Sequence, residues 1–191
     1  MATVTRRGLA RREQLLNAMA DLVAERGFHQ VGIVDIGAAA GVSGSALYRH
    51  FENKQLMLVA LLDRVVDDLV ERACEAIAGA PTDEDALRAL IAGHVDFAVR
   101  DRSIIKVYDQ EAHALPDADR HRLRRAMSGY ADLWVDVVAR LRPDLSRPAA
   151  SVAVRATFGL LNSVADYGAR LPADDEAALL CAMGYRALTG G

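Results

Sequence analysis

The sequence has few cysteines and no long apolar run, and each absence excludes a class of protein. Its two cysteines, Cys74 and Cys181, lack the spacing of metal ligands, so we interpret them as buried thiols and expect no metal site. Hydrophobic residues make up 52% of the 191 positions, yet no uninterrupted apolar stretch reaches the ~18 residues of a membrane span. The N-terminal residues MATVTRRGLARRE contain no apolar segment of a signal peptide. We therefore expect a cytoplasmic protein without a membrane partner.

The alternation of apolar and polar residues that marks a half-buried strand is also absent, and no repeat of about 20–50 residues occurs. Apolar residues recur at helical spacing instead, and Gly, Pro and acidic residues separate the segments. This pattern predicts an all-α protein of about nine helices. The expected ranges are 9–26, 33–40, 44–50, 54–78, 82–100, a short helix around 104–108, 117–142, 148–169 and 173–188.

The net charge of -3 is distributed unevenly along the chain. Through Lys54 the sequence holds seven basic and five acidic residues, or +2, which leaves -5 for the remainder. A basic end on an acidic body suits a protein that contacts DNA with one end only.

The most specific pattern in the chain runs from Gly32 to Lys54 and reads GIVDIGAAAGVSGSALYRHFENK. Its first apolar residues share one helical face, and Gly37 within that helix costs about 1 kcal/mol of helix propensity relative to alanine. Gly41 suits the positive φ that ends a helix, and Ser43 suits the N-cap of the next one. The pattern predicts a helix-turn-helix, whose second helix can enter a DNA major groove.

Within this stretch, AGVSGSALYRHFENK resembles the DNA-binding signature of the TetR family of bacterial transcriptional regulators. The specific part is Leu-Tyr-x-His-Phe followed three residues later by Lys, directly after Ala-Gly-Val-Ser. The resemblance implies a three-helix DNA-binding head over residues 1–53 and a helical ligand-binding and dimerisation body over residues 54–191. It further implies a homodimer on a double-stranded DNA operator, and a regulator without cofactor rather than an enzyme.

The resemblance also assigns roles to the polar side chains after the turn. Tyr48 and His50 are expected to hydrogen-bond DNA phosphates, and Arg49 is our candidate for a contact with guanine O6 and N7. Lys54 lies in the first turn of the next helix, where a lysine opposes the helix dipole. A phosphate shared by Lys54 and the helix amides would explain that placement.

Two positions depart from the usual family pattern. Gly32 lacks the hydroxyl that often contacts a phosphate there, and Gly44 stands where the family often has a lysine or arginine. Gly44 and Ser45 leave the start of the recognition helix small, so its backbone can approach DNA closely. The basic N-terminal arm can supply further contacts through Arg6 and Arg7, which suit the minor groove.

The resemblance places an effector pocket between the long fourth helix and the eighth. The corresponding residues are mostly apolar with a few polar groups, which fits a small hydrophobic effector such as a fatty acyl group or its CoA ester. The expected lining residues are Leu62, Val66, Phe97, Ile105, Tyr108, Met127, Tyr130, Trp134, Phe158 and Asn162.

The family forms dimers through its last two long helices, and small residues recur in both of them here. Small side chains allow two helices to approach closely, either between subunits or within one. The expected interface residues are Ala156, Gly159, Ser163, Ala177 and Gly184.

These expectations combine into a ligand-released repressor. Effector binding beside the fourth helix would tilt that helix, change the separation of the two recognition helices and lower the affinity for a palindromic operator. Two other functions stay open. The chain could be a helical protein-interaction module with a vestigial helix-turn-helix. It could also be an enzyme that uses Asp109, Glu111 and His113, although no catalytic motif accompanies them.

Overall fold

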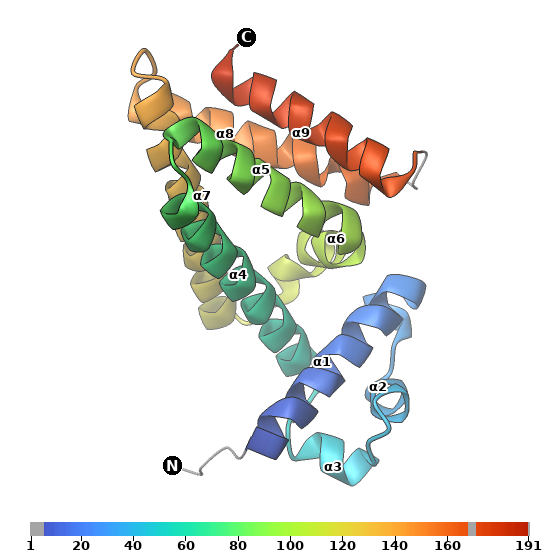
Figure 1. The fold of residues 1–191 in the computed structure, drawn as a ribbon. Helices are drawn as coiled ribbons and strands as arrows, with labels where there is room; N and C mark the ends of the chain where they lie inside the picture. Colours follow the sequence, from blue (N-terminus) through green and yellow to red (C-terminus); the bar gives the residue numbers. More distant parts are fainter. Residues whose placement is uncertain (1–5, 168–170, 191) are drawn as a thin grey trace.

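The computed structural model describes residues 6–167 and 171–190, with the backbone alone for residues 6, 7, 44, 45 and 114. Every regular element in these ranges is helical, which confirms the predicted all-α fold of nine helices (Figure 1). The helices are α1 (Arg6–Arg26), α2 (Ile33–Ala39), α3 (Gly44–Tyr48), α4 (Lys54–Gly79), α5 (Asp83–Arg100), α6 (Arg102–Glu111), α7 (Asp117–Leu141), α8 (Arg147–Asn162) and α9 (Ala173–Thr189). Short 3-10 turns span Phe28–Gln30, Ala112–Ala114 and Ser163–Ala165.

Most predicted helix boundaries lie within three residues of the observed ones, but the eighth helix ends early. We predicted that it would continue to residue 169, whereas α8 ends at Asn162. The chain tightens there into the Ser163–Ala165 turn, and the Ser163 hydroxyl donates a hydrogen bond to the Leu160 carbonyl at 2.7 Å. A serine that bonds back to its own helix competes with regular helical bonding, which accounts for the early end.

Side-chain caps begin the two helices that flank the body's first hairpin. Asn53 accepts a hydrogen bond from the Leu56 N–H at 2.8 Å at the start of α4. Thr82 accepts one from the Asp85 N–H at 3.1 Å at the start of α5. Each cap satisfies an N–H group that the helix itself cannot pair.

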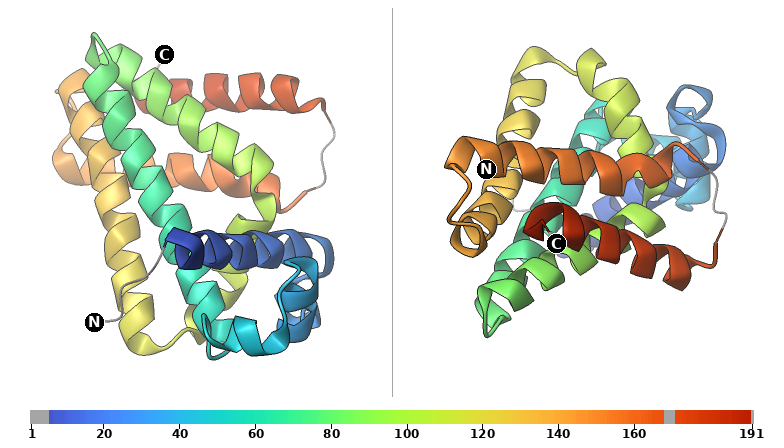
Figure 2. Two further views of the ribbon diagram at one scale, coloured as in Figure 1. Left: turned by 60° about the horizontal axis from the view of Figure 1, so that its bottom comes forward. Right: turned by 90° about the horizontal axis from the view of Figure 1, so that it is seen from above.

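Figure 1 shows α1–α3 gathered at one end of the molecule, from which α4 runs into the body. There α4 packs against α5 and α7, and α8 packs against α9 at the far end from the head (Figure 2). The long helix α4 is thus the element that the head and the body share.

The buried side chains form two clusters that meet along α4. The head cluster includes Leu15 and Met19 of α1, and it continues through Met57, Leu61 and Val66 of α4. The body cluster joins α5, α7, α8 and α9 to the second half of α4. The division of the chain at residue 53 therefore remains a prediction from sequence, since the packing of the head extends well beyond that residue.

The two cysteines correct one expectation. Cys74 is exposed and Cys181 is half-buried, so the interpretation of both as buried thiols is wrong. Within the described ranges, none of the helices combines the length and the apolar character needed to cross a membrane.

Candidate nucleic-acid interface

The turn between α2 and α3 depends on two glycines. Gly41 has a φ of 61°, the left-handed conformation that was predicted for it. The Val42 N–H then donates to the Gly37 carbonyl at 2.8 Å and holds the turn against α2. A Cβ on Gly37 would lie 3.1 Å from the Val42 oxygen and 3.2 Å from the Leu47 Cδ1 atom. Gly37 therefore allows α3 to approach α2 closely, a packing role that helix propensity alone does not reveal.

The start of α2 is capped by a carboxylate that the sequence analysis missed. Gly32 has no side chain to act as a cap, but Asp35 accepts a hydrogen bond from the Gly32 N–H at 2.8 Å. The signal in the sequence is an acidic residue three positions after the cap, which is half of a capping box. The bond fixes the Asp35 carboxylate within the first turn of its own helix.

The recognition helix α3 is anchored on one side and exposed on the other. Leu47 is 1% exposed and fills the head core, whereas Tyr48 is 54% exposed and Arg49 projects into solvent. The helix ends at Tyr48, two residues before the predicted end, so Arg49 and the half-buried His50 lie just beyond it. The Tyr48 phenol and the Arg49 guanidinium are thus exposed at the end of α3, and neither belongs to the core.

A surface hollow beside α3 adds one arginine to the predicted set. It is lined by Arg11 of α1 together with Arg49 and His50. Arg11 lies one turn after the N-terminal arginines, and its guanidinium donates to the Gln14 side chain at 3.1 Å. The sequence did not indicate that Arg11 lies beside Arg49, because that proximity depends on how α1 crosses the helix-turn-helix. The expected contributions of Arg6, Arg7 and Ser45 involve side chains outside the described residues. Gly44 begins α3, and its expected close approach to DNA stays a prediction.

Lys54 has an internal role that the sequence did not indicate. Its ammonium group donates to the main-chain carbonyls of Phe28 at 2.8 Å and Val31 at 2.9 Å. It also lies 4.2 Å from the centroid of the Phe28 ring. Lys54 thereby ties the start of α4 to the turn after α1. One of its three N–H donors remains for a phosphate, so the predicted contact stays a prediction.

The predicted effector pocket is filled by side chains in this conformation. The rings of His94, Tyr130 and Phe158 stack on one another in pairs, with centroids 4.9–5.8 Å apart. The Trp134 ring meets all three edge-on. Leu62, Val66, Ile105, Tyr130 and Trp134 are at most 5% exposed. Tyr108, Met127, Phe97 and Phe158 are partly buried against the two cores.

His94 is the residue of this cluster that sequence reasoning did not select as functional. Its Nδ1 atom lies 3.1 Å from the Tyr130 hydroxyl, and its Nε2 atom lies 2.9 Å from the Asn162 side-chain oxygen. Burial lowers the pKa of His94 to about 4, and the bond to Asn162 opposes that shift only in part. The imidazole is therefore neutral near pH 7.

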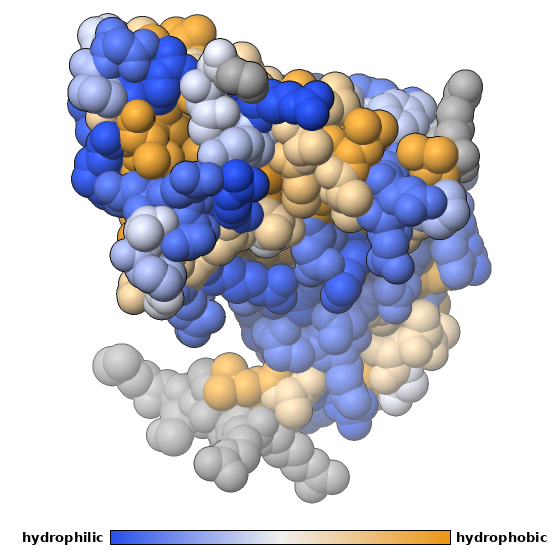
Figure 3. Space-filling view, turned by 45° about the horizontal axis from the view of Figure 1, so that its top comes forward, coloured by the Kyte–Doolittle hydropathy of each residue, from blue (hydrophilic) through white to orange (hydrophobic). Residues whose placement is uncertain are grey.

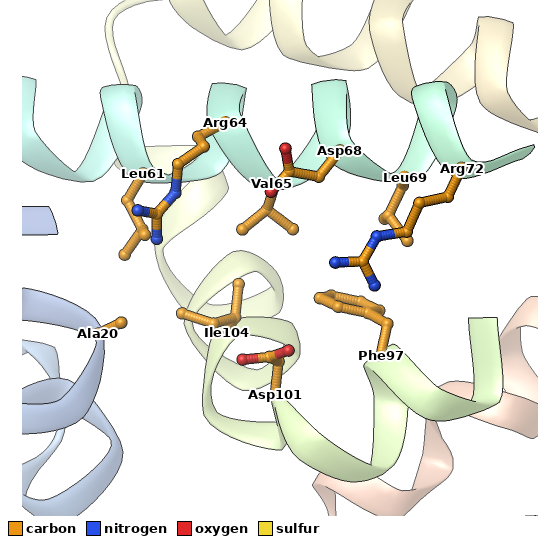
Figure 4. A pocket seen from close by; sticks show the side chains of 10 residues that line it. All are labelled: Ala20, Leu61, Arg64, Val65, Asp68, Leu69, Arg72, Phe97, Asp101 and Ile104. Carbon is orange, nitrogen blue, oxygen red and sulfur yellow. The ribbon is translucent and has the colours of Figure 1, made fainter. Parts of the chain in front are cut away.

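Two hollows lie along the seam between α4 and α5. The outer one, of about 110 Å³, lies where α1, α4 and α6 meet (Figure 4). Arg64, Asp68 and Arg72 project into it from α4, and Arg72 reaches toward the Phe97 ring. The inner hollow, of about 20 Å³, shares Leu69 and Arg72 with the outer one and is lined by His94 and Tyr130. A volume of that size holds about one water molecule.

Matches to known families cover both the head and the body. Residues 15–61 match the family described as bacterial regulatory proteins, tetR family, and residues 80–166 match a tetracyclin repressor-like C-terminal domain. The chain belongs to the TetR family of transcriptional regulators. This is a family of DNA-binding regulators and not of enzymes.

Relatives of this TetR-family protein include both a repressor and an activator of transcription. The chain is 30% identical over 129 residues to the transcriptional repressor KstR2 of Rhodococcus jostii, a match that covers 67% of this chain and 63% of that protein. It is 29% identical over 130 residues to the transcriptional activator FasR of Mycolicibacterium smegmatis, covering 68% and 59%. These matches span about three fifths of either relative.

The fold of the TetR-family chain also superposes on solved structures over nearly its whole length. The structure of the regulator FadR of Bacillus subtilis in complex with stearoyl-CoA has a TM-score of 0.77 and 20% sequence identity. The match covers 94% of this chain and 98% of that one, and at this identity it demonstrates the fold alone.

The five residues that the TetR resemblance placed in the dimer interface do not share one environment. Ala156 and Gly159 are exposed on α8, as an interface position requires, while Ser163 and Ala177 are half-buried. Gly184 is buried within the subunit, and a Cβ there would lie 3.3 Å from Leu161 Cδ2. Its smallness thus serves the packing of α9 on α8 in one subunit, which corrects the prediction for Gly184.

Larger apolar side chains, which we did not select, surround the exposed small ones. Val152 on α8 is 69% exposed, and Leu179 and Met183 on α9 are 52% and 42% exposed. Figure 3, which looks toward this end of the molecule, shows apolar surface there among hydrophilic residues.

The residues of the enzyme alternative do not form a site. Glu111 is buried and pairs with His29 at 2.8 Å, while Asp109 and His113 are exposed. Neighbouring protein atoms exclude part of the water around the Asp109 carboxylate, and this partial desolvation together with the nearby Asp166 raises the pKa of Asp109. Among the described residues no group of three His, Cys, Asp or Glu side chains could hold a metal ion.

Proposed function

We propose that this regulator binds a two-fold symmetric DNA operator as a homodimer and loses affinity when a small hydrophobic effector enters its body. The observation that carries the proposal is the exposure of Tyr48 and Arg49. Both side chains project outward at the end of α3, and the turn before that helix is held by Gly37 and Gly41. A recognition helix anchored in this way can dock on DNA without rearrangement.

The exposed groups divide into base and phosphate contacts. Arg49 has the planar fork that suits guanine O6 and N7, whereas Tyr48, His50 and the neighbouring Arg11 suit phosphates. Arg6, Arg7, Gly44 and Ser45 complete the predicted surface, and Lys54 contributes its remaining N–H.

Dimerisation explains how one short recognition helix can suffice. Two such helices that lie about 34–36 Å apart read two half-sites in successive major grooves. The exposed apolar side chains of Val152, Leu179 and Met183, with Ala156 and Gly159 between them, supply a surface that a second copy could bury.

The effector class is supported by what named relatives and solved structures contain. Bacillus subtilis FadR was solved with stearoyl-CoA, and AibR was solved with isovaleryl coenzyme A and operator DNA. A relative in Bacillus subtilis is named a fatty acid metabolism regulator. KstR2 is described as a ketosteroid regulator. We therefore propose a hydrophobic effector of the acyl-CoA or steroid type. The relatives comprise repressors and an activator, and repression is our proposal for this chain.

Coupling between effector and DNA would run through α4. Arg64 of α4 donates to Glu13 at 2.7 Å and to Asn17 at 2.8 Å, both on α1. An effector that shifts α4 in the body would therefore also move α1 and the helix-turn-helix. A coupling free energy of about 1–3 kcal/mol corresponds to roughly 5–150-fold in DNA affinity. A regulator of chromosomal DNA works in the cytoplasm, which is where we expect this one.

The test measures binding of the full chain to DNA upstream of its own gene, by fluorescence anisotropy at several salt concentrations. Arg49→Ala should weaken specific binding by about 1–3 kcal/mol, and Tyr48→Phe should weaken it across sequences. Neither substitution should change the unfolding free energy by more than about 0.5 kcal/mol, since both side chains are exposed. Arg125→Ala removes an exposed arginine from α7 and should leave DNA affinity unchanged. Failure to bind such DNA at all would favour the interaction-module alternative.

A further inference from the structure

The hydrogen-bond donors and acceptors around His94 do not balance. The one assignment that satisfies both contacts has the Tyr130 hydroxyl donating to Nδ1 and the Nε2 proton donated to the Asn162 oxygen. The Asn162 amide group then retains two N–H donors without an acceptor among the described residues. The cluster therefore holds unused donors at its half-buried edge, where Asn162 lies.

The indole of Trp134 adds a further donor. Trp134 is completely buried, and its Nε1 atom is the buried side-chain polar atom that lacks a hydrogen-bond partner in the described part of the chain. It lies near enough to the Tyr130 hydroxyl to oppose slightly the rise that burial causes in the pKa of Tyr130, but without the geometry of a hydrogen bond. A buried donor left unpaired lowers stability, so its presence calls for an acceptor in another state of the protein.

The Phe97 ring separates this cluster from the outer hollow. Phe97 lines the outer hollow, and its ring packs edge-on against the His94 imidazole at 6.1 Å between centroids. The inner hollow beside His94 lies on the other side of Leu69 and Arg72. Phe97 and Phe158 are only partly buried, unlike Tyr130 and Trp134. Rotation of these two phenylalanine rings would join the outer hollow to the unpaired donors.

We propose that the effector presents a neutral carbonyl oxygen to the Trp134 indole N–H and the Asn162 amide, while its apolar part takes the place of the Phe97 and Phe158 rings. The chemical class is an acyl thioester or a ketone on a hydrophobic skeleton. This inference rests on the proposed function, because it specifies the effector of the same regulator.

The charges of the two regions favour a neutral acceptor over a carboxylate. His94 is neutral near pH 7, and no cationic side chain belongs to the ring cluster. A carboxylate buried there would remain without a counter-ion. The cations Arg64 and Arg72 line the outer hollow, with Asp68 and Asp101. Arg72 also borders the inner hollow, but its guanidinium reaches toward the Phe97 ring in the outer one. Any charged portion of the ligand would therefore lie in the outer hollow, with the carbonyl further inside.

The experiment compares ligands that differ in the carbonyl alone. Palmitoyl-CoA is paired with S-hexadecyl-CoA, a thioether without the carbonyl oxygen, and androst-4-ene-3,17-dione is paired with androst-4-ene. Trp134 is the single tryptophan of the chain, so its intrinsic fluorescence reports binding directly in the full-length protein. At least one carbonyl ligand should bind about tenfold more tightly than its partner and shift the tryptophan emission. The pair that shows this difference identifies the source of the carbonyl.

Trp134→Phe keeps an aromatic ring but removes the donor. Measured by calorimetry, this variant should lose most of the preference for the carbonyl ligand while its affinity for the carbonyl-free partner changes little. Equal affinities within both pairs, no binding of either carbonyl ligand, or an undiminished preference in Trp134→Phe would each overturn the proposal. The comparison in the unmodified protein holds even if the variant does not fold.

Binding of operator DNA separates this inference from the proposed function. If a carbonyl ligand binds at Trp134 but leaves DNA affinity unchanged, the gating function fails and the inference stands. If DNA is released equally by the ligand with the carbonyl and the ligand without it, the function stands and the inference fails.

Discussion

In the head, the polar side chains at the end of α3 project into solvent, whereas in the body His94 and Tyr130 of the aromatic cluster are buried and bonded to each other. Tyr48 is 54% exposed, while His94 and Tyr130 are each 2% exposed. The head can therefore meet a polyanion with the geometry it already has. The aromatic cluster can receive a ligand only after its rings move, because the outer hollow beside it, of about 110 Å³, is smaller than the ~300 Å³ of an ordinary ligand site.

The difference predicts which substitutions affect stability and which affect binding alone. Removal of an exposed side chain in the head should change DNA affinity with little effect on folding. Removal of a buried polar partner in the body should lower the free energy of unfolding by several kcal/mol, so that any change of ligand affinity comes with a loss of stability. The following predictions test this contrast, from the largest expected effect to the smallest.

The largest effect should come from the buried ion pair of the body. Arg102 of α6 donates to the Glu176 carboxylate of α9, whose side chain is 5% exposed. Arg102→Met leaves that carboxylate buried without a partner and should lower the unfolding free energy by about 3–5 kcal/mol. Urea denaturation measures the change.

Two further variants serve as controls for that prediction. Arg102→Met combined with Glu176→Leu should recover much of the loss, because the unpaired charge is then gone. Arg100→Ala breaks an exposed pair with Asp96 and should lower the unfolding free energy by only about 0–1 kcal/mol. A loss as large for Arg100→Ala as for Arg102→Met would contradict the contrast between buried and exposed polar groups.

The protein should become less stable as the pH decreases, because of His94. Its pKa is lowered to about 4 in the folded protein, against about 6.5 in an unfolded chain. Between these values the unfolded state binds a proton that the folded state does not, so the contribution is complete above pH 6.5 and is lost as the pH falls toward 4. The loss amounts to about 3 kcal/mol.

Urea denaturation of unmodified protein and of His94→Gln, at pH 7 and pH 4.5, isolates this contribution. The variant should lose less stability between the two pH values than the unmodified protein. His121→Gln, an exposed position on α7, should leave the difference unchanged. An equal pH dependence in His94→Gln and the unmodified protein would show that the buried imidazole is not responsible.

Lys54 differs least from the buried polar residues of the body, because its ammonium group is already hydrogen-bonded to carbonyls of the head. Lys54→Met removes two charge-assisted bonds to carbonyl oxygens and should lower the unfolding free energy by about 2 kcal/mol. If Lys54 also contacts a phosphate, the slope of log affinity against log salt concentration should decrease by about 1. A lower stability with an unchanged slope would assign Lys54 to the fold alone.

The features that could be predicted from the sequence also differ between the head and the body. The helix-turn-helix could be predicted because its determinants, such as Gly41 and Asn53, act on neighbours a few residues away. The roles of Lys54 and His94 could not, because each depends on groups far along the chain: Phe28 for Lys54, and Asn162 for His94. Helical spacing identified the aromatic residues of the body but could not distinguish a lined cavity from a filled one.

The smallest effect concerns two glycines that sequence alone would treat alike. Alanine gains about 1 kcal/mol of helix propensity over glycine. At Gly129 of α7 a Cβ meets nothing within 4 Å, so Gly129→Ala should raise the unfolding free energy by about 0.5–1 kcal/mol. At Gly37 the Cβ meets the Val42 oxygen, which cannot move freely because the Val42 N–H is bonded to the Gly37 carbonyl.

Gly37→Ala should therefore lower the unfolding free energy by about 1 kcal/mol despite the better propensity, and it should also weaken DNA binding by displacing α3 from α2. Thermal denaturation of both variants, with DNA affinity measured in parallel, checks the opposite signs. If both alanines stabilise the protein, the turn between α2 and α3 has more freedom than a preformed DNA surface allows. The head would then not be rigid, and the contrast with a body that must open would no longer hold.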